Sequence, residues 1–529
     1  MLAGTISGLG SHYVITLEAI NAQTGDSLES EQVEAESKEQ VLKSLDRAAS
    51  RLREKLGESI GSVQKFATPL EAATTSSLDA LKEFSLGQAA HLRFDDDAAI
   101  PHFERAVELD PNFAMAWAVL GIAHNNKSNT QEALKDLQKA FDLKDRASER
   151  ERFYISSHYY ETGQRDVDHS VQIYQQWIQT YPRDGVPLGN LALVYGFIGQ
   201  HEKALAAATE ALRLDEKDPY AYQNVASAYL ALNRYDEART IADQSIAQKA
   251  EPWTVHLVLY SLAFIRGDEN AKGQELQRAA GRPEEPVFLL FHASGLCTSG
   301  KVREAGETYA RAARDAQAKG LKEYAAGIVL SDGLCLATLG YTSEAKQKVG
   351  PALAISEDRD AQVEAAYLLA RTGDAERAQK IVDSVAKQWP SDTALNQVDV
   401  ALMRGIVSLE HQQVAQAIAQ TESVDRYQLG TGVRGTGYTP NFVRGEIFLR
   451  AHDGAKALAE YQTILDHRGV DATSVLYALA YLGKGRASAM LGDSAKAKAA
   501  YQDLFGIWKD ADPDLPVLKA AQAEYEKLK

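Results

Sequence analysis

Cysteine is scarce in this sequence, and so are the long apolar runs that membrane spans need. Only Cys297 and Cys335 occur, and each is expected to be a buried small residue rather than a metal ligand or a redox centre. No stretch reaches the ~18 apolar residues of a spanning helix. The N-terminus has no basic segment followed by an apolar run, so no signal peptide is expected. Taken as written, the chain is expected in the cytoplasm, although its few cysteines do not fix the compartment.

Basic residues are also in the minority. The chain has 57 Lys and Arg against 73 Asp and Glu, which gives a formal net charge of −16. No run of Lys and Arg forms the basic patch that is typical of nucleic-acid binders, so we expect no nucleic-acid partner. No Ser/His/Asp, Cys/His or metal-ligand set stands at a recognisable spacing. The sequence therefore predicts no catalytic residue, no cofactor and no metal ion.

What the sequence does contain is a repeat. Two segments that start at Gly185 and Pro219 place residues of similar size at an interval of ~34 positions, which resembles the tetratricopeptide repeat, a stacking helix–turn–helix unit. The first segment has Leu188, Leu191, Ala192, Tyr195, Ala204, Ala208 and Ala211, and the second has Tyr222, Val225, Ala226, Tyr229, Ala238, Ala242 and Ser245. The alanines at the eighth and twentieth positions are expected where two helices approach most closely.

The same pattern extends over most of the chain with varying clarity. It is clear from residue 77, decays between 253 and 390, is interrupted at 428–440, and returns before the end. We predict a repeat array of about a dozen helix pairs over 77–514 and a C-terminal capping helix over 515–529, whose polar outer face would keep the solenoid soluble. Residues 61–76 are interpreted as a linker.

The first 60 residues do not show the repeat pattern. Tyr13, Ile15 and Leu17 alternate with polar neighbours, the period of a strand. Further strands are expected over 2–7 and 28–35, and a helix after Ser37. Three strands and one helix are too few for a stable core, so residues 1–60 are interpreted as part of an α/β domain. The predicted fold class is a mainly α tetratricopeptide-repeat superhelical solenoid, preceded by this small truncated α/β segment.

Four segments carry a more specific resemblance. They are Lys55-Leu56-Gly57-Glu58-Ser59, Ala73-Thr74-Thr75-Ser76-Ser77-Leu78, Glu108-Leu109-Asp110-Pro111-Asn112-Phe113-Ala114 and Trp508-Lys509-Asp510-Ala511-Asp512-Pro513-Asp514. Together they resemble the C-terminal region of bacterial membrane-bound serine/threonine protein kinases. In that group a kinase domain, one membrane span, a small α/β domain and a long repeat array follow one another. The resemblance implies a sensing or docking role, and an extracytoplasmic location if the chain is part of such a kinase.

The chain departs from that family where catalysis resides. It has no Val-Ala-Ile-Lys strand, no His-Arg-Asp loop and no Asp-Phe-Gly, so no catalytic residue can be carried over. Met1 falls inside the family's α/β domain. The leading hypothesis is a non-catalytic protein-interaction scaffold of a bacterial signalling protein. The alternatives are the tail fragment of a serine/threonine kinase and the regulatory half of a winged-helix transcription factor.

The candidate binding residues lie on the first helices of the two clearest repeats. Asn190 and Asn224 occupy the same repeat position, and an amide offers a hydrogen-bond acceptor and two donors to an extended peptide. Both side chains are expected to face solvent in a concave groove that binds a protein or peptide partner. Gly189 and Gln223 stand where a carboxylate clamp would need Lys or Arg, so no C-terminal carboxylate is expected. The neighbouring groove residues would be Leu193, Phe197, Tyr220 and Ser227.

One glycine motif needs a separate interpretation. Residues 430–435, Gly-Thr-Gly-Val-Arg-Gly, fit the G-x-G-x-x-G pattern of nucleotide-binding loops. Such a loop should follow a strand and open a helix, but this one lies between helical repeats. We interpret it as an inter-repeat loop.

Overall fold

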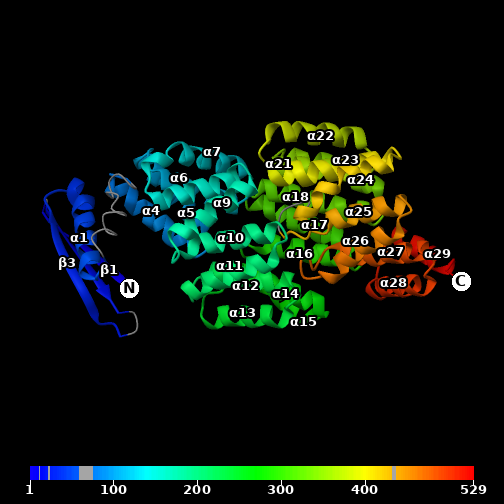
Figure 1. Ribbon diagram of the computed structural model, residues 1–529, viewed down its shortest axis with the longest axis horizontal. Coiled ribbons are helices and arrows are strands. Elements are labelled where there is room, and N and C mark those ends of the chain that lie inside the picture. The colour runs from blue at the N-terminus through cyan, green and yellow to red at the C-terminus, as the bar shows by residue number, and fades with distance from the viewer. Residues whose placement is uncertain (11, 22–23, 59–74, 432–436, 529) are drawn as a thin grey trace. The chain divides into compact units, whose positions relative to one another are not determined.

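The computed structural model describes every residue except 11, 22–23, 59–74, 432–436 and 529. It divides into two compact units, Met1–Gly163 and Gln164–Lys529. Strands occur only in the first unit, and the described residues after Ser77 form helices and the turns between them (Figure 1). The predicted fold class, mainly helical with a short strand region near the N-terminus, is confirmed.

A three-stranded antiparallel meander with one helix opens the first unit. Its elements are β1 (Leu2–Leu9), β2 (His12–Ile20), β3 (Ser27–Ala35), the 3-10 helix η1 (Lys38–Gln40) and α1 (Val41–Lys55). Ile15 stands opposite Ile6 on β1 and opposite Val33 on β3, so these apolar side chains share one face of the sheet. α1 covers that face over β2 and β3, and Ile15 and Ala48 are fully buried between sheet and helix.

Helix pairs complete the first unit. They are α4 (Leu78–His91), α5 (Asp96–Leu109), α6 (Ala114–Asn126), α7 (Thr130–Asp142), η2 (Lys144–Arg146), α8 (Glu149–His158) and the π-helical turn η3 (Tyr159–Gly163). α4 packs on α5, and α6 on α7. Phe103 and Phe113 are fully buried between them, so these repeats have an aromatic core.

The second unit is helical throughout its described residues. Its elements are α9 (Val167–Thr180), α10 (Gly185–Phe197), α11 (His201–Leu214), α12 (Pro219–Ala231), α13 (Tyr235–Ala247), α14 (Trp253–Arg266), α15 (Glu269–Ala279), α16 (Glu285–Thr298), α17 (Val302–Ala318), α18 (Lys322–Thr338), α19 (Thr342–Gln347), α20 (Val349–Ile355), α21 (Arg359–Arg371), α22 (Ala375–Gln388), η4 (Leu395–Asp399), α23 (Val400–Glu410), α24 (Val414–Gln420), η5 (Glu422–Tyr427), α25 (Thr439–Arg450), α26 (Gly454–Asp466), α27 (Val475–Met490), α28 (Ser494–Ile507) and α29 (Pro516–Glu526).

Local sequence sets the ends of these helices. Asp184 and Asp218, one repeat apart, are the N-caps of α10 and α12, and each carboxylate accepts a hydrogen bond from a first-turn N–H. The turn inside each of these repeats needs a left-handed residue, supplied by Gly199 with φ 73° and by Asn233 with φ 59°. Glycine and asparagine are the residues that adopt this conformation most readily.

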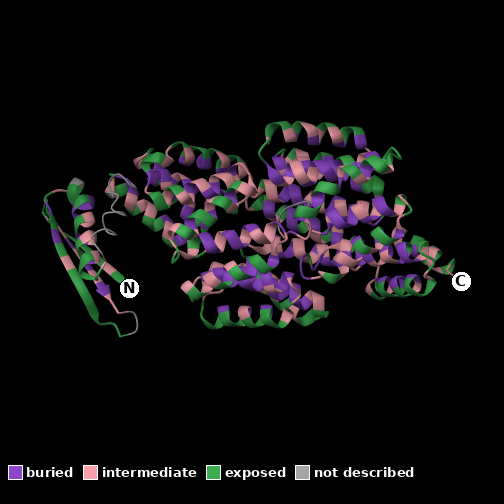
Figure 2. Cartoon of the chain, viewed as in Figure 1, coloured by how far each residue is buried: buried purple, intermediate pink, exposed green. Residues whose placement is uncertain are grey.

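Small residues let the paired helices approach closely, as the repeat pattern predicts. Ala192, Ala204, Ala226 and Ala238 are all buried. Gly445 shows the same effect, because a Cβ built there would lie 2.7 Å from the ring of Tyr461. Buried and exposed residues alternate along outer helices such as α13, whose outward side is exposed (Figure 2).

The core of the second unit also joins repeats that are far apart in sequence. One cluster combines Ala231 of α12 and Ala293 of α16 with Val470, Tyr477 and other residues of the last repeats. α16 packs directly against α27. The second unit is therefore closed by contacts between its earlier and later repeats.

Candidate protein-binding surfaces

The structure brings the predicted groove residues together on two adjacent helices. α10 carries Asn190, Leu193 and Phe197, and α12 carries Tyr220, Asn224 and Ser227. Ser227 is exposed, Asn224 is buried, and the other four are half-buried. The six residues lie on one pair of neighbouring first helices, as the repeat register requires.

Asn224 does not face solvent, so that part of the prediction is wrong. Its side chain is only 6% exposed, and its Nδ2 donates a hydrogen bond to the Gly189 carbonyl at 3.0 Å. The amide therefore lies between α10 and α12, against the backbone of Gly189. Asn224 thus joins neighbouring repeats, and Asn190 is the amide that keeps partial access to solvent. That the six predicted groove residues contact a peptide stays a prediction.

Segments of the chain itself contact the turns of these same repeats. At the end of α10, the Thr431 N–H donates to the Gly196 carbonyl at 3.0 Å. His201 Nε2 lies 2.7 Å from the Leu429 carbonyl. A carbonyl only accepts, so Nε2 carries the proton, and burial lowers the pKa of His201, which keeps the ring neutral.

The next repeat makes the most specific of these contacts. Asn233 Nδ2 donates to the Asp466 carbonyl at 2.6 Å, and Asn233 Oδ1 accepts from the Gly469 N–H at 2.8 Å. The Tyr235 hydroxyl donates to the same Oδ1 at 2.8 Å. One amide therefore holds an acceptor and a donor of another segment's main chain. We call Asn233 and Tyr235 the amide clamp.

Further along the chain, side chains of α16 bind the later repeats at Thr473. The Ser294 hydroxyl donates to the Thr473 carbonyl at 2.8 Å, and the Thr298 hydroxyl donates to the same oxygen. Trp508 Nε1 donates to the Thr298 carbonyl at 2.9 Å. Side chains on both sides thus bind main-chain atoms of the other, from α16 to Thr473 and from Trp508 back to Thr298.

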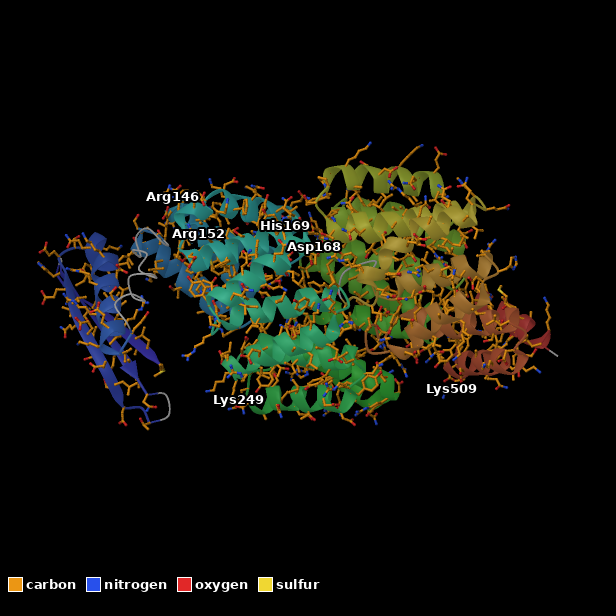
Figure 3. All side chains as sticks on the ribbon, viewed as in Figure 1. Arg146, Arg152, Asp168, His169, Lys249 and Lys509 are labelled. Carbon is orange, nitrogen blue, oxygen red and sulfur yellow. A yellow bond between two sulfur atoms is a disulfide. The ribbon has the colours of Figure 1, made fainter. Side chains whose placement is uncertain are left out.

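Ion pairs extend the same line of contacts toward α9. Arg165 forms a double hydrogen bond with Asp360, at 2.8 and 3.0 Å. Asp168, labelled in Figure 3, pairs with Arg426. The Thr393 N–H donates to the Arg165 carbonyl at 3.1 Å. We call these contacts together the seam. The seam joins residues 360–508 to Arg165, Asp168, Gly196, His201, the amide clamp, Ser294 and Thr298.

A buried ionic cluster adjoins the seam. Arg359 pairs with Asp360 and Asp392, and Asp392 is fully buried. Burial raises the pKa of Asp392 and raises the pKa of Asp399 well above its usual range, against the opposing effect of Arg359. The cluster therefore makes the loss of a proton from these two carboxyl groups less favourable than from an exposed aspartate.

The two cysteines are joined to each other. Cys297 of α16 and Cys335 of α18 form a disulfide, and both are buried. The prediction that both cysteines are buried is correct. The sequence analysis did not predict the bond between them. Their separation of 38 residues is close to one repeat, and that spacing is the signal that could have paired them.

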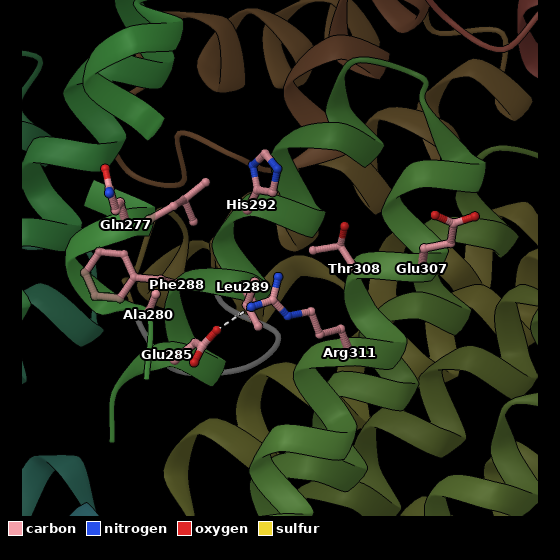
Figure 4. Close-up of a pocket in the computed structure, with 10 residues that line it drawn as sticks. Gln277, Ala280, Glu285, Phe288, Leu289, His292, Glu307, Thr308 and Arg311 are labelled. Carbon is pink, nitrogen blue, oxygen red and sulfur yellow. Dashed lines mark hydrogen bonds and ion pairs between the residues drawn. The ribbon is translucent and has the colours of Figure 1, made fainter. Parts of the chain in front are cut away.

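A cavity lies between α15, α16 and α17 (Figure 4). Its volume is about 460 Å³. Phe288 and Leu289 contribute apolar lining, and Glu285 and Arg311, which also line the cavity, form an ion pair at 2.5 Å. Burial lowers the pKa of His292 at the rim, so this side chain is neutral near pH 7. The cavity thus combines apolar side chains with a neutral imidazole and a paired carboxylate.

Two further expectations bear on chemistry. Of the G-x-G-x-x-G motif, residues 432–435 lie outside the described part, and Thr431 takes part in the seam. Within the described residues, no group of His, Cys, Asp and Glu has the geometry of a metal site. No helix among them is long and apolar enough to cross a membrane.

The amide clamp is the feature that the sequence analysis missed. Asn233 occupies the turn position at which the preceding repeat has Gly199, ~34 residues earlier. A left-handed asparagine at a turn is common, so its type alone indicated no function. The later segment that it binds could not be read from a repeat pattern.

Comparisons with known proteins agree on the type of repeat. Models described as tetratricopeptide repeat match residues 96–147 and 199–253. Anaphase-promoting complex subunit 3 of Schizosaccharomyces pombe is 24% identical over 175 residues, which are 33% of this chain and 26% of that protein. The chain thus spans about a quarter of the length of this curated relative.

Solved structures of repeat proteins also match parts of the chain. A thermophilic TPR protein of Thermus thermophilus, TTC0263, covers 34% of this chain and 95% of its own, at 21% identity and a TM-score of 0.29. The TPR domain of P58(IPK) covers 72% of this chain and 98% of its own, at 13% identity and a TM-score of 0.22. The chain contains tetratricopeptide repeats at residues 96–147 and 199–253, within a mainly helical fold.

Proposed function

We propose that this chain is a protein-interaction scaffold, the sensing or docking region of a bacterial signalling protein. Tetratricopeptide-repeat proteins generally bind protein or peptide partners, and two stretches match that repeat. The observation that carries the proposal is the amide clamp, in which Asn233 holds a main-chain carbonyl and a main-chain N–H of another segment. Groups of this kind recognise a polypeptide by its backbone.

The bacterial kinase setting is the finer part of the proposal. It rests on the resemblance of segments such as Glu108–Ala114 and Trp508–Asp514 to the region that follows the kinase domain in membrane-bound serine/threonine kinases. In that setting the chain docks partners and another domain carries out phosphoryl transfer. A fragment of such a kinase, or the regulatory half of a winged-helix transcription factor, would use the same array in the same way.

We also propose that the array works outside the cytoplasm. Disulfides persist in oxidising compartments and are rare in the cytosol, where thiols are kept reduced. The bond between Cys297 and Cys335 therefore favours the extracytoplasmic alternative over the cytoplasmic expectation. The test is rapid acid quenching of cells, followed by unfolding of the protein and alkylation before any reductant is added. Two blocked thiols would contradict the proposal, and two unreacted cysteines would support it.

The scaffold function is tested by capture from extracts of the native organism. The full chain, immobilised through its C-terminus, should retain a defined set of proteins that free chain competes away in proportion to its concentration. Sequencing upstream of the Met1 codon separates the settings, because an in-frame kinase domain or winged-helix domain would identify one of them. Retention of nothing that free chain displaces would contradict the scaffold function.

A further inference from the structure

The amide clamp sits against one particular kind of structure. α26 ends at Asp466, whose carbonyl is one of the last-turn groups that have no partner inside the helix. Asn233 Nδ2 satisfies this carbonyl, and Asn233 Oδ1 satisfies the N–H of Gly469 in the following turn. The clamp therefore binds the C-terminal end of a helix together with the turn that leaves it.

Glycine is needed in that turn for reasons of space. A Cβ built on Gly469 would lie 1.7 Å from the Leu230 carbonyl oxygen, which no real side chain could tolerate. The left-handed conformation plays no part, since Gly469 is not among the residues with positive φ. The end of α12 and the clamp thus form a notch that only a glycine can enter.

Hydrogen bonds and backbone conformation fix the position of both sides of this contact. Tyr235 donates to Asn233 Oδ1 and fixes the direction of the amide. Asn233 is itself held in the left-handed turn between α12 and α13. The occupant is held independently as well, because the Tyr438 hydroxyl donates to the His467 carbonyl at 2.7 Å. Each side of the contact therefore has a hydrogen bond of its own that does not involve the other side.

The contact also lies at the solvent edge of the seam. Asp466 and Asp471 are exposed, while Val470 and Thr473 beside them are buried. Release of the turn at Asn233 would thus begin at the surface, without parting α16 from α27.

We propose that Asn233 and the end of α12 form a binding site for a helix C-terminus followed by a glycine turn, and that the chain's own residues 466–469 occupy it when no partner is bound. The recognised chemistry is a helix-end carbonyl, an N–H three residues later, and a glycine at that second position. The partner is a helical protein with such an end exposed. This inference rests on the proposed scaffold function and locates one of its contacts.

The experiment uses the full chain and a defined peptide. Gly469→Val should expel the chain's own turn, and hydrogen exchange should report faster exchange over residues 466–474 than in the parent. A fluorescent peptide of residues 454–474 with its natural glycine should then bind the Gly469→Val protein and leave the parent, whose site is filled, unbound. Adding Asn233→Ala to the Gly469→Val protein should weaken this binding at least tenfold.

Two controls keep the test decisive. Gly506→Val adds the same side chain where a new Cβ meets nothing within 4 Å, so it should change neither exchange nor peptide binding. A peptide that itself carries Gly469→Val should not bind. If Gly469→Val does not fold, as judged by circular dichroism, Asn233→Ala alone should speed exchange at Gly469. Unchanged exchange there, or peptide binding that ignores Asn233, would overturn the proposal. Capture of partners by the parent chain is measured separately, so failure here leaves the scaffold function standing.

Discussion

Cys297 and Cys335 connect α16 to α18 through a buried disulfide, immediately beside Thr298 of the seam. The bond spans 38 residues of sequence, so it restricts the unfolded chain over about one repeat. Its strongest effect is therefore expected on the stability of the repeats between α16 and α18.

The first prediction is that replacing both cysteines by alanine lowers the free energy of unfolding. The chain-entropy model gives about 4 kcal/mol for a loop of this length, within a measured range of ~0–5 kcal/mol. Urea unfolding of the double variant, compared with the parent with and without reductant, checks the value. Reductant should lower the stability of the parent and leave the variant unchanged. Equal stability of parent and variant under non-reducing conditions would show that the bond does not form.

A second prediction concerns helix packing. Ala204 of α11 is 4% exposed at a close contact between helices, so Ala204→Leu should destabilise the array by about 1–3 kcal/mol through overpacking. Ala206→Leu adds the same atoms on the exposed side of the same helix and serves as the control. Denaturant melts that find both variants as stable as the parent would mean that the repeat register is misplaced.

A third prediction separates the two equivalent asparagines. Asn224→Ala removes a buried amide and its hydrogen bond to the Gly189 carbonyl, which should cost about 0.5–1.5 kcal/mol. Asn190→Ala at the partly exposed position should leave stability within ~0.5 kcal/mol. If Asn190 contacts a peptide, its substitution should weaken partner binding by up to roughly tenfold. Thermal melts and titration with a captured partner measure the two effects, and equal melts for both variants would contradict the assignment.

A fourth prediction concerns pH. Burial raises the pKa of Asp399 well above that of an unfolded chain, so the folded state binds this proton more tightly than the unfolded state does. Its contribution to stability is then fully present below the unfolded pKa of ~4 and is lost as the pH rises toward the folded pKa. Asp399→Asn should remove this dependence on pH. The free energy of unfolding of the variant should therefore increase relative to that of the parent as the pH rises.

The measurement is urea unfolding of parent and Asp399→Asn at several values between pH 4 and pH 8. The charged groups that surround Asp399 are Arg165, Arg359, Asp360 and Asp392, and they are common to both proteins. Asp503→Asn, at an exposed position on α28, serves as the control and should follow the parent. Parallel curves for Asp399→Asn and the parent would show that Asp399 is already ionised in the folded state.

Most of the local architecture could be read from residue spacing. The alternation of Tyr13, Ile15 and Leu17 predicted β2, because successive side chains of a strand point to opposite faces. The alanines at the eighth and twentieth repeat positions predicted the close contacts of α10–α13, since a helix pair can approach only where side chains are small. These patterns reflect contacts within one repeat or between neighbouring repeats. A short segment of sequence therefore includes all the residues that take part.

The candidate site was read less well, and Asn224 shows why. The repeat register placed it on the correct helix and beside Asn190. Whether an amide points to solvent or to a neighbouring carbonyl depends on how the two helices pack, and here Asn224 Nδ2 donates to the Gly189 carbonyl of α10. The position of a residue within its repeat does not tell which group of the neighbouring repeat its side chain reaches.

The sequence by itself determined the helix pairs, their caps and turns, and the small sheet, because these follow from side-chain size and spacing over a few residues. The tertiary structure decided the seam, the amide clamp and the pairing of Cys297 with Cys335. Those contacts join residues as distant as Asn233 and Gly469. The Asn233 contact depends on the packing of repeats far apart in sequence and the disulfide on the packing of α16 against α18, and neither is contained in the spacing of residues within one repeat.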